Sequence, residues 1–334
     1  MITRSVMSAL SPAGEHGRLS VLIFHRVLAR PDALFPWETD ARRFDRICGW
    51  LRHWFEVLPL DQAVQRLRAG TLPRRAAAIT FDDGYADNHD VALPILERHR
   101  LPATFFIASG FLGGGRMFND SVIETVRRAR GSALNLRSLG VPGLALHDLS
   151  NNAARRGTID AILAAIKYLP PPERDALTVD IALRAGVAAL PDDLMLQPAQ
   201  VRALHRAGMQ IGAHTCTHPI LARLDDTRAQ AEIVDGRAAL EALIDAPVSL
   251  FAYPNGKPGA DYLPTHVAAA RAAGFDAAFS TVAGAASGSS DPFQLPRFTP
   301  WDRSRLRFGA RLAANLWQSR TRRRSASPHP IAQA

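Results

Sequence analysis

Long apolar runs are absent from this chain of 334 residues, and cysteines are scarce. The two cysteines, Cys48 and Cys216, exclude the disulfide framework of a small secreted domain. No apolar stretch approaches the roughly 20 residues that a membrane span requires. The N-terminal segment also lacks the continuous apolar core of a secretory signal. We therefore expect a cytoplasmic location, which includes the inner face of the cytoplasmic membrane.

Acidic residues are fewer than basic ones, and the excess is confined to one end of the chain. The net charge is +9. Nine arginines and one acidic residue lie between Arg297 and Arg324, so this segment accounts for eight of the nine net charges. The body is nearly neutral, which argues against a nucleic-acid partner. The leucines and aromatic residues among these arginines fit two structures: a terminal helix packed on the domain, or a helix lying on an anionic membrane surface.

Short apolar runs alternate with helical patterns along most of the chain. Continuous apolar runs are typical of strands that are covered on both faces. Their alternation with helices predicts an α/β fold, a distorted (β/α) barrel of about seven to eight parallel strands. The expected strands are 19–25, 55–60, 76–83, 103–109, 209–215, 248–254, 276–281 and 293–299. The expected barrel helices are 40–54, 61–69, 87–99, 199–207, 225–244 and 261–273.

One stretch interrupts this alternation. About 100 residues separate the runs 103–109 and 209–215, too many for a single connection. Helical patterns at 119–130, 150–168 and 172–189 predict a helical insertion on the barrel rim, over about 113–200, that either shapes substrate access or serves as a structural cover. The predicted organisation is an N-terminal extension (1–18), a barrel domain with the insertion (19–303) and a basic C-terminal helix and tail (304–334).

Polar residues directly follow several expected strands. His25 ends the first run, Asp82 and Asp83 follow "AAAITF", and His214 follows "MQIGA", with His218 four residues later. The carboxyl ends of parallel strands share one face of a barrel, so these residues are expected to converge. Alone, Asp-Asp-Gly is commonly a turn, and a histidine after a strand is often structural. Together they form a donor set that suits Zn²⁺, with one aspartate left free as a base.

Three segments resemble, in this order, the motifs of the polysaccharide deacetylase (NodB-homology) family of carbohydrate esterases. "TFDDG" at 80–84 is similar to the first motif, and "HTCTH" at 214–218 is similar to the second. "FAYPNG" at 251–256 lies where the third motif belongs. The resemblance covers residues 19–300. It implies a distorted β/α barrel, a divalent metal that is commonly zinc, and hydrolysis of N-acetyl groups on sugars.

The resemblance also implies roles for the residues of the first two motifs. Asp82 would be the catalytic base, and Asp83 would be a metal ligand. His214 and His218 would complete the ligand set. Thr215 occupies the small hydroxyl position of the second motif and would buttress the loop between the two histidines.

The third motif and the last strand depart from the family pattern. Tyr253 and Asn255 would support the substrate or the oxyanion, with Asn255 at the usual aromatic position. Ala252 stands where members often carry an arginine that orients the base, and the last strand lacks the late histidine that serves as general acid. In a branch that acts on exopolysaccharides, the acid comes from an early strand, and His25 fits that arrangement. Arg297 would then orient the base.

These observations predict a metal-dependent deacetylase that acts on amino sugars of a polysaccharide or a lipid-linked glycan, in exopolysaccharide biosynthesis. The expected partner is an N-acetylated glycan, the expected cofactor is Zn²⁺, and the basic tail is expected to contact a membrane peripherally. Two alternatives stay open. The same barrel could hydrolyse a non-sugar linear amide or ureide, or the chain could be a carbohydrate-binding pseudoenzyme, as the departures in the third motif and last strand suggest.

Overall fold

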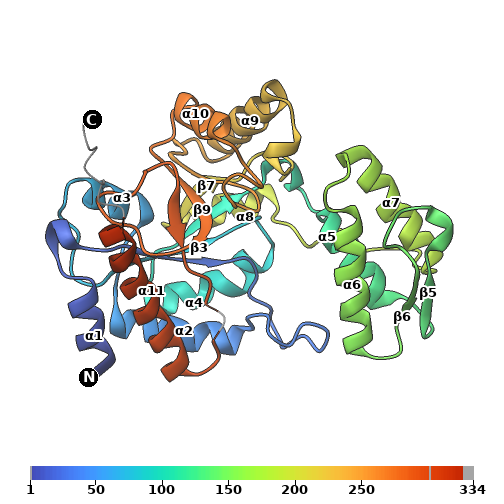
Figure 1. Ribbon diagram of the computed structural model, residues 1–334, viewed down its shortest axis with the longest axis horizontal. Coiled ribbons are helices and arrows are strands. Elements are labelled where there is room, and N and C mark those ends of the chain that lie inside the picture. The colour runs from blue at the N-terminus through green and yellow to red at the C-terminus, as the bar shows by residue number, and fades with distance from the viewer. Residues whose placement is uncertain (1, 301, 326–334) are drawn as a thin grey trace, which may run out of the picture.

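A nearly closed parallel barrel forms the centre of the computed structural model, which describes residues 2–300 and 302–325 (Figure 1). Neighbouring strands follow the order β1-β3-β4-β7-β8-β9-β10, and β2 pairs with the start of β3. The amide of Phe298 donates to the carbonyl of Val21 at 2.7 Å, and the amide of Ile23 donates to the carbonyl of Phe298 at 3.0 Å. These two hydrogen bonds join the first and last strands. The predicted barrel is thus confirmed. Its strands are β1 (Ser20–Phe24), β2 (Glu56–Val57), β3 (Ala76–Phe81), β4 (Thr104–Ile107), β7 (Gln210–Ala213), β8 (Leu250–Ala252), β9 (Ala277–Ala283) and β10 (Leu295–Arg297).

Helices begin at side-chain caps that the sequence supplies. The carboxylate of Asp40 accepts the amide of Arg43 at 2.9 Å where α2 begins, and Asp225 does the same at α9. The helix expected at 261–273 begins only at Pro264, because proline has no amide hydrogen and suits the first helical turn. The barrel helices are α2 (Ala41–Trp54), α3 (Leu60–Arg68), α4 (Leu93–His99), α8 (Pro198–Arg206), α9 (Asp226–Ile244) and α10 (Pro264–Ala272).

The apolar core fills one end of the barrel and leaves the other end to polar groups. Val64 and Leu67 of α3 belong to the same buried cluster as Val21, Phe106 and Phe279 of the strands. This helix therefore covers the end at which the strands begin. The carboxyl ends of the strands lie on the opposite side, toward the insertion (Figure 1).

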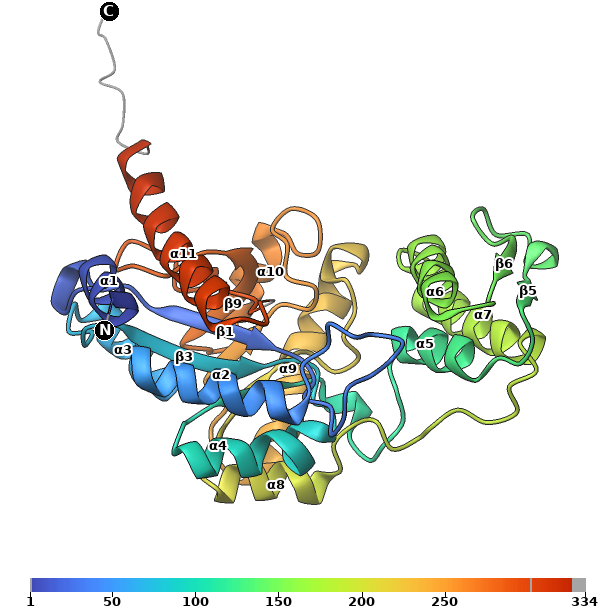
Figure 2. The ribbon, with the colours of Figure 1, turned by 90° about the horizontal axis from the view of Figure 1, so that it is seen from below.

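The insertion forms a separate lobe beside the barrel (Figure 2). Its core includes Val126, Ile159 and Ile181, and Leu34 from the loop after β1 joins them. The insertion contains the expected helices, and an antiparallel hairpin of two three-residue strands, too short to show alternation and not predicted from the sequence, lies among them. The last helix stops before 189 because Gly186, at φ +65°, favours a left-handed termination. Its elements are α5 (Phe118–Arg128), β5 (Ala133–Asn135), β6 (Leu146–Asp148), α6 (Asn152–Ile166) and α7 (Pro171–Arg184).

Two helices near the chain ends pack against each other, α1 (Ile2–Leu10) and α11 (Arg305–Ser325). The ring of Phe308 in α11 lies 5.5 Å from that of Trp50 and 6.1 Å from that of Trp54 in α2. The helix in the N-terminal extension was not predicted from the sequence. The expected tail at 326–334 lies outside the described residues. Among the residues that the structure describes, no helix combines the length and apolarity needed to cross a bilayer.

Candidate active site

The carboxyl ends of four strands supply the polar groups of one site. Asp82 and Asp83 follow β3, His214 follows β7, Arg297 ends β10 and His25 follows β1. All but His25 are buried. Parallel strands place their carboxyl ends on one face of a barrel, so residues far apart in sequence meet there.

Asp83, His214 and His218 form a compact triad of metal-ligand atoms. The Oδ1 atom of Asp83 lies 3.4 Å from Nε2 of His214 and 3.3 Å from Nε2 of His218. The three ligand atoms all lie within 4.8 Å of one another. This Oδ1 atom is buried and has no hydrogen-bond partner among the described residues. A buried carboxylate oxygen in that state is costly unless a ligand completes it.

The triad fits a tetrahedral metal ion such as Zn²⁺. Imidazole and carboxylate ligands lie about 2.0–2.2 Å from zinc, so two of them at a tetrahedral angle are about 3.4 Å apart. The two distances from Asp83 match that separation. With three protein ligands, a fourth position would stay open for water or substrate, as in catalytic zinc sites.

Electrostatics favour the metal-binding forms of Asp83 and His218, whereas they shift His214 toward its protonated form. Burial raises the pKa of Asp83, but the imidazoles of His218 and His214 outweigh it and lower that pKa. Burial lowers the pKa of His218 to about 4, so this imidazole is neutral at pH 7. Burial also lowers the pKa of His214, but the Asp82 carboxylate outweighs it and raises that pKa. An ionised carboxylate beside a neutral imidazole is what a divalent ion requires.

Hydrogen bonds outside the triad orient both imidazoles. Nδ1 of His214 donates to the carbonyl of Ala252 at 2.7 Å, which directs Nε2 toward Asp83. The hydroxyl of Thr215 donates to the carbonyl of His214 at 2.5 Å and accepts the amide of His218 at 3.1 Å. The Thr215 hydroxyl thus links the backbone of the two histidines, and the buttressing role that the resemblance implies for it stays a prediction.

Asp82 lies beside the triad and is held by Arg297. The two guanidinium nitrogens of Arg297 donate to the two carboxylate oxygens of Asp82, both at 2.7 Å. The third nitrogen, Nε, donates to the carbonyl of Ser280 at 3.0 Å. Burial raises the pKa of Asp82, but the adjacent Arg297 charge outweighs it and lowers that pKa. Asp82 is therefore ionised at neutral pH and fixed in orientation, with Oδ2 4.0 Å from Nε2 of His214.

The loop between the two histidines depends on a residue that the sequence analysis missed. Glu232 of α9 accepts the amides of Cys216 and Thr217 at 2.9 and 2.8 Å, and its other oxygen accepts the Thr217 hydroxyl. One turn later, a Cβ atom at Gly236 would lie 2.7 Å from the carbonyl carbon of Thr215. The glycine allows the helix to approach the loop closely. No spacing in the sequence links residue 232 to this loop.

The third motif contributes less than expected. The amide of Tyr253 donates to the carbonyl of Phe279 within the sheet. The hydroxyl of Tyr253 donates to the carbonyl of Phe293. Its ring stacks on Tyr262 at 3.9 Å in the core. The supporting role predicted for Tyr253 is therefore wrong, since both polar groups are engaged elsewhere. Asn255 is half-buried in the left-handed region at φ +58°, on the loop that leaves β8.

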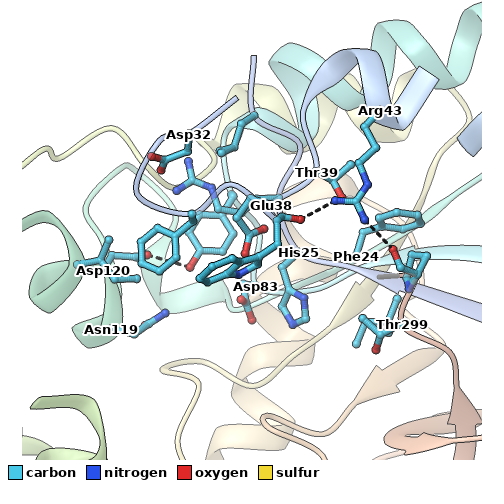
Figure 3. A pocket seen from close by; sticks show the side chains of 18 of the residues that line it. Phe24, His25, Asp32, Glu38, Thr39, Arg43, Asp83, Asn119, Asp120 and Thr299 are labelled. Carbon is cyan, nitrogen blue, oxygen red and sulfur yellow. Dashed lines mark hydrogen bonds between the residues drawn. The ribbon is translucent and has the colours of Figure 1, made fainter. Parts of the chain in front are cut away.

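A cavity of about 280 Å³ opens beside Asp83 (Figure 3). His25 lies in its lining with an exposed side chain. Trp37, from the loop after β1, is 43% exposed and offers an aromatic face. The hydroxyl of Tyr85 donates to Asp120 of α5 at 3.0 Å, which ties the insertion to the first motif. The sequence analysis did not single out these last three residues.

Comparison with known proteins agrees with this geometry. The family model described as "Polysaccharide deacetylase" matches residues 69–156 and 167–278, well over half of the chain. The chain belongs to the polysaccharide deacetylase family.

Curated relatives and solved structures place this polysaccharide deacetylase among similar proteins. It is 26% identical to the poly-beta-1,6-N-acetyl-D-glucosamine N-deacetylase of Staphylococcus aureus over 177 aligned residues. These aligned residues make up 53% of this chain. The chain spans 60% of the length of that relative. The IcaB structure from Ammonifex degensii aligns over 92% of this chain and 98% of its own, with TM-score 0.57 and 19% identity. The deacetylase PplD of Streptococcus pyogenes aligns over 84% of this chain and 92% of its own, with TM-score 0.56 and 17% identity. These structural likenesses bear on the fold.

One departure from the family pattern has a structural counterpart in this polysaccharide deacetylase. The resemblance placed an arginine that orients the base in the third motif, where this chain has Ala252. Arg297 reaches the same carboxylate from β10 and forms a two-pronged pair with it. The carbonyl of Ala252 instead orients His214.

Proposed function

We propose that this protein hydrolyses N-acetyl groups on the amino sugars of an exopolysaccharide, and that a β-1,6-linked N-acetylglucosamine chain is its first candidate substrate. The observation that carries the proposal is the Asp82–Arg297 pair beside the Asp83–His214–His218 triad, at the edge of an open cavity. The substrate candidate comes from the curated relatives, whose printed activity is deacetylation of that polymer.

The triad would hold a divalent metal ion, with Zn²⁺ suited to two imidazoles and a carboxylate. Such an ion lowers the pKa of a coordinated water and polarises a carbonyl group. Asp82 takes a proton from the attacking water at a carboxylate oxygen, since Arg297 keeps that carboxylate ionised and fixed. The amide of Asn255 is our candidate donor to the developing oxyanion.

His25 donates a proton to the leaving nitrogen in this proposal. A sugar amine cannot leave as an anion in water, so the reaction needs a general acid. His25 lies in the cavity lining with Asp83, and its side chain is open to solvent and substrate. Trp37 offers a flat apolar face to a pyranose ring in the same cavity.

Acetate release from β-1,6-linked N-acetylglucosamine oligomers tests the proposal. The protein is stripped of metal, reconstituted with Zn²⁺ and compared with Asp82→Asn treated identically. We expect zinc-dependent release, and a loss of about 10²–10⁴-fold in Asp82→Asn with its bound zinc retained. Wild-type turnover by Asp82→Asn would contradict the base assignment. Absence of release from the reconstituted wild type would contradict the activity.

Contact with an anionic membrane surface is a further part of the proposal. Leu306 and Trp317 of α11 are 82% and 55% exposed, and eleven positions separate them, which is about 20° around a helix axis. Arg307 and Arg311 are exposed about 100° and 140° farther round this helix than Leu306, and Arg311 also pairs with Asp302. Basic residues beside an exposed apolar stripe suit anionic headgroups. We expect sedimentation with anionic but not neutral vesicles, and loss of it in Leu306→Ala/Trp317→Ala. Location at the inner face of the cytoplasmic membrane stays a prediction.

A further inference from the structure

A second cavity, of about 400 Å³, lies between the insertion and the loop that carries His218. The side of the insertion is formed by residues of α5 and α7, among them Phe118, Arg174 and Val179. The side of the barrel is formed by Thr217 and His218. This cavity thus begins at one metal ligand and extends beneath the insertion.

The two cavities adjoin the triad from different sides. Asp83 lines the first cavity and His218 lines the second, and the facing atoms of these two side chains are 3.3 Å apart. Helix α5 borders both, with Asn119 and Ile123 on the first cavity and Phe118 on the second. A chain molecule that reacts at the triad therefore has room on both sides of the reacting unit.

Arg174 gives the second cavity a buried hydrogen-bond donor. Arg174 is 8% exposed over the whole residue, and its guanidinium lies 4.0 Å from the centre of the Phe118 ring. Its Nε atom has no hydrogen-bond partner among the described residues, and the carboxylate of Asp175 is 3.7 Å away, too far for a hydrogen bond. Because Arg174 lines the cavity and holds Asp175 only at ion-pair distance, its guanidinium can donate to a ligand oxygen there.

We propose that this second cavity is a subsite for the sugar residue adjoining the one that is deacetylated, with Arg174 donating to its oxygen atoms. The subsite rests on the proposed deacetylase function and deepens it. A pyranose supplies hydroxyl and ring oxygens to a donor and apolar C–H groups to Phe118. Occupation of both cavities selects residues within a glycan chain over a single sugar.

Chain-length dependence tests this subsite. The kcat/KM of the zinc-loaded protein is measured on N-acetylglucosamine and on its β-1,6-linked dimer, for wild type, Val179→Trp and Leu183→Trp. Val179 lines the second cavity and is 59% exposed, so tryptophan can fill the cavity without disturbing the core. Leu183 is 70% exposed one turn later on α7, outside that lining, and serves as the matched control.

We expect the wild-type kcat/KM to rise about tenfold or more from the single sugar to the dimer, the contribution of one or two hydrogen bonds from a charged donor. Val179→Trp should bring that ratio close to one, and Leu183→Trp should keep it. In the Asp82→Asn background, Arg174→Met should weaken dimer binding about tenfold in calorimetry, with less loss for the single sugar.

The outcomes separate the subsite from the proposed function. Acetate release at the same kcat/KM for the single sugar and the dimer would overturn the subsite and leave the deacetylase standing. The subsite would also be overturned if Val179→Trp left the ratio of the kcat/KM values for the two substrates unchanged. Near-ultraviolet circular dichroism must then show that the new tryptophan is ordered. Lack of release from every oligomer by the zinc-loaded wild type would refute the deacetylase function on which the subsite rests.

Discussion

The barrel and the insertion treat their buried charges differently. In the barrel, Asp82 and Arg297 are 2% and 1% exposed, and two hydrogen bonds of 2.7 Å join them. In the insertion, Arg174 is 8% exposed, and its Nε atom lacks a partner among the described residues. The Asp82–Arg297 pair is therefore complete within the barrel, whereas Arg174 holds Asp175 only at an ion-pair distance of 3.7 Å and, in our proposal, donates to a bound ligand.

The two regions also have separate cores. The insertion has its own apolar cluster, and polar contacts tie it to the barrel side, such as Arg127 with Asp32 and Asp120 with Tyr85. We conclude that the barrel fixes the reacting groups, while the insertion fixes what surrounds them. Barrel variants should therefore impair turnover of every substrate, and insertion variants should change the response to chain length or pH.

The largest effect is expected for His214→Ala, which removes one of three ligand atoms. Zinc affinity should fall by more than about 100-fold, since even residues that only support a ligand contribute 10–100-fold. Acetate release should fall to the background. Zinc content after dialysis, measured by mass spectrometry, checks the cause. Full zinc stoichiometry in the variant would place the metal elsewhere.

Arg297→Met should destabilise the barrel strongly. It leaves the buried Asp82 carboxylate without its partner, and such losses amount to about 3–5 kcal/mol in the free energy of unfolding. The pKa of Asp82 should rise, and the acidic limb of the kcat/KM profile should move to higher pH. Arg297→Lys keeps the charge but not the paired geometry, so it should lose less. Equal unfolding midpoints in urea for wild type and Arg297→Met would contradict this pairing.

Asp120, a residue of the insertion, makes a pH-dependent contribution to the free energy of unfolding. Burial raises its pKa to about 6, above the unfolded value of about 3.9. Folding therefore favours the protonated form, and stability should fall by up to ~3 kcal/mol as pH rises from about 4 to above 6. Asp120→Asn lacks this titration. The unfolding free energy of the variant relative to wild type should increase between pH 5 and 8. A pH-independent difference would contradict the raised pKa.

Glu232→Gln should give the smallest of these effects. The loop between the histidines loses a charged acceptor for two amides, so zinc affinity should fall about tenfold while the fold persists. Glu241→Gln is the control, because that residue lies on the same helix and pairs with Arg237 instead. A competitive chelator titration measures both. Equal zinc affinities in Glu232→Gln and Glu241→Gln would show that Glu232 does not support the metal site.

Much of the fold follows from the sequence, because apolar runs report covered strands and the polar residues after them report one barrel face. The meeting of Asp82 with Arg297 was a hypothesis of the same kind, since both lie at strand ends. Glu232 carries no such mark, because its contact with the loop depends on how closely α9 packs. The pairing of Tyr85 with Asp120 joins the barrel to the insertion, and no local pattern specifies that docking. The hairpin at 133–148 was missed because its strands have three residues each.

The left-handed backbone conformations around the triad affect which substitutions evolution would favour at these positions. Asp83, His218 and Asn255 all adopt left-handed conformations, with φ of +76°, +53° and +58°. Such a conformation disfavours a side chain by about 1–2 kcal/mol, and glycine would relieve it. Selection for stability alone would thus replace these residues with glycine. In homologous genes that keep the barrel, glycine at positions 83 and 218 would mark lineages in which the demand for metal chemistry has lapsed.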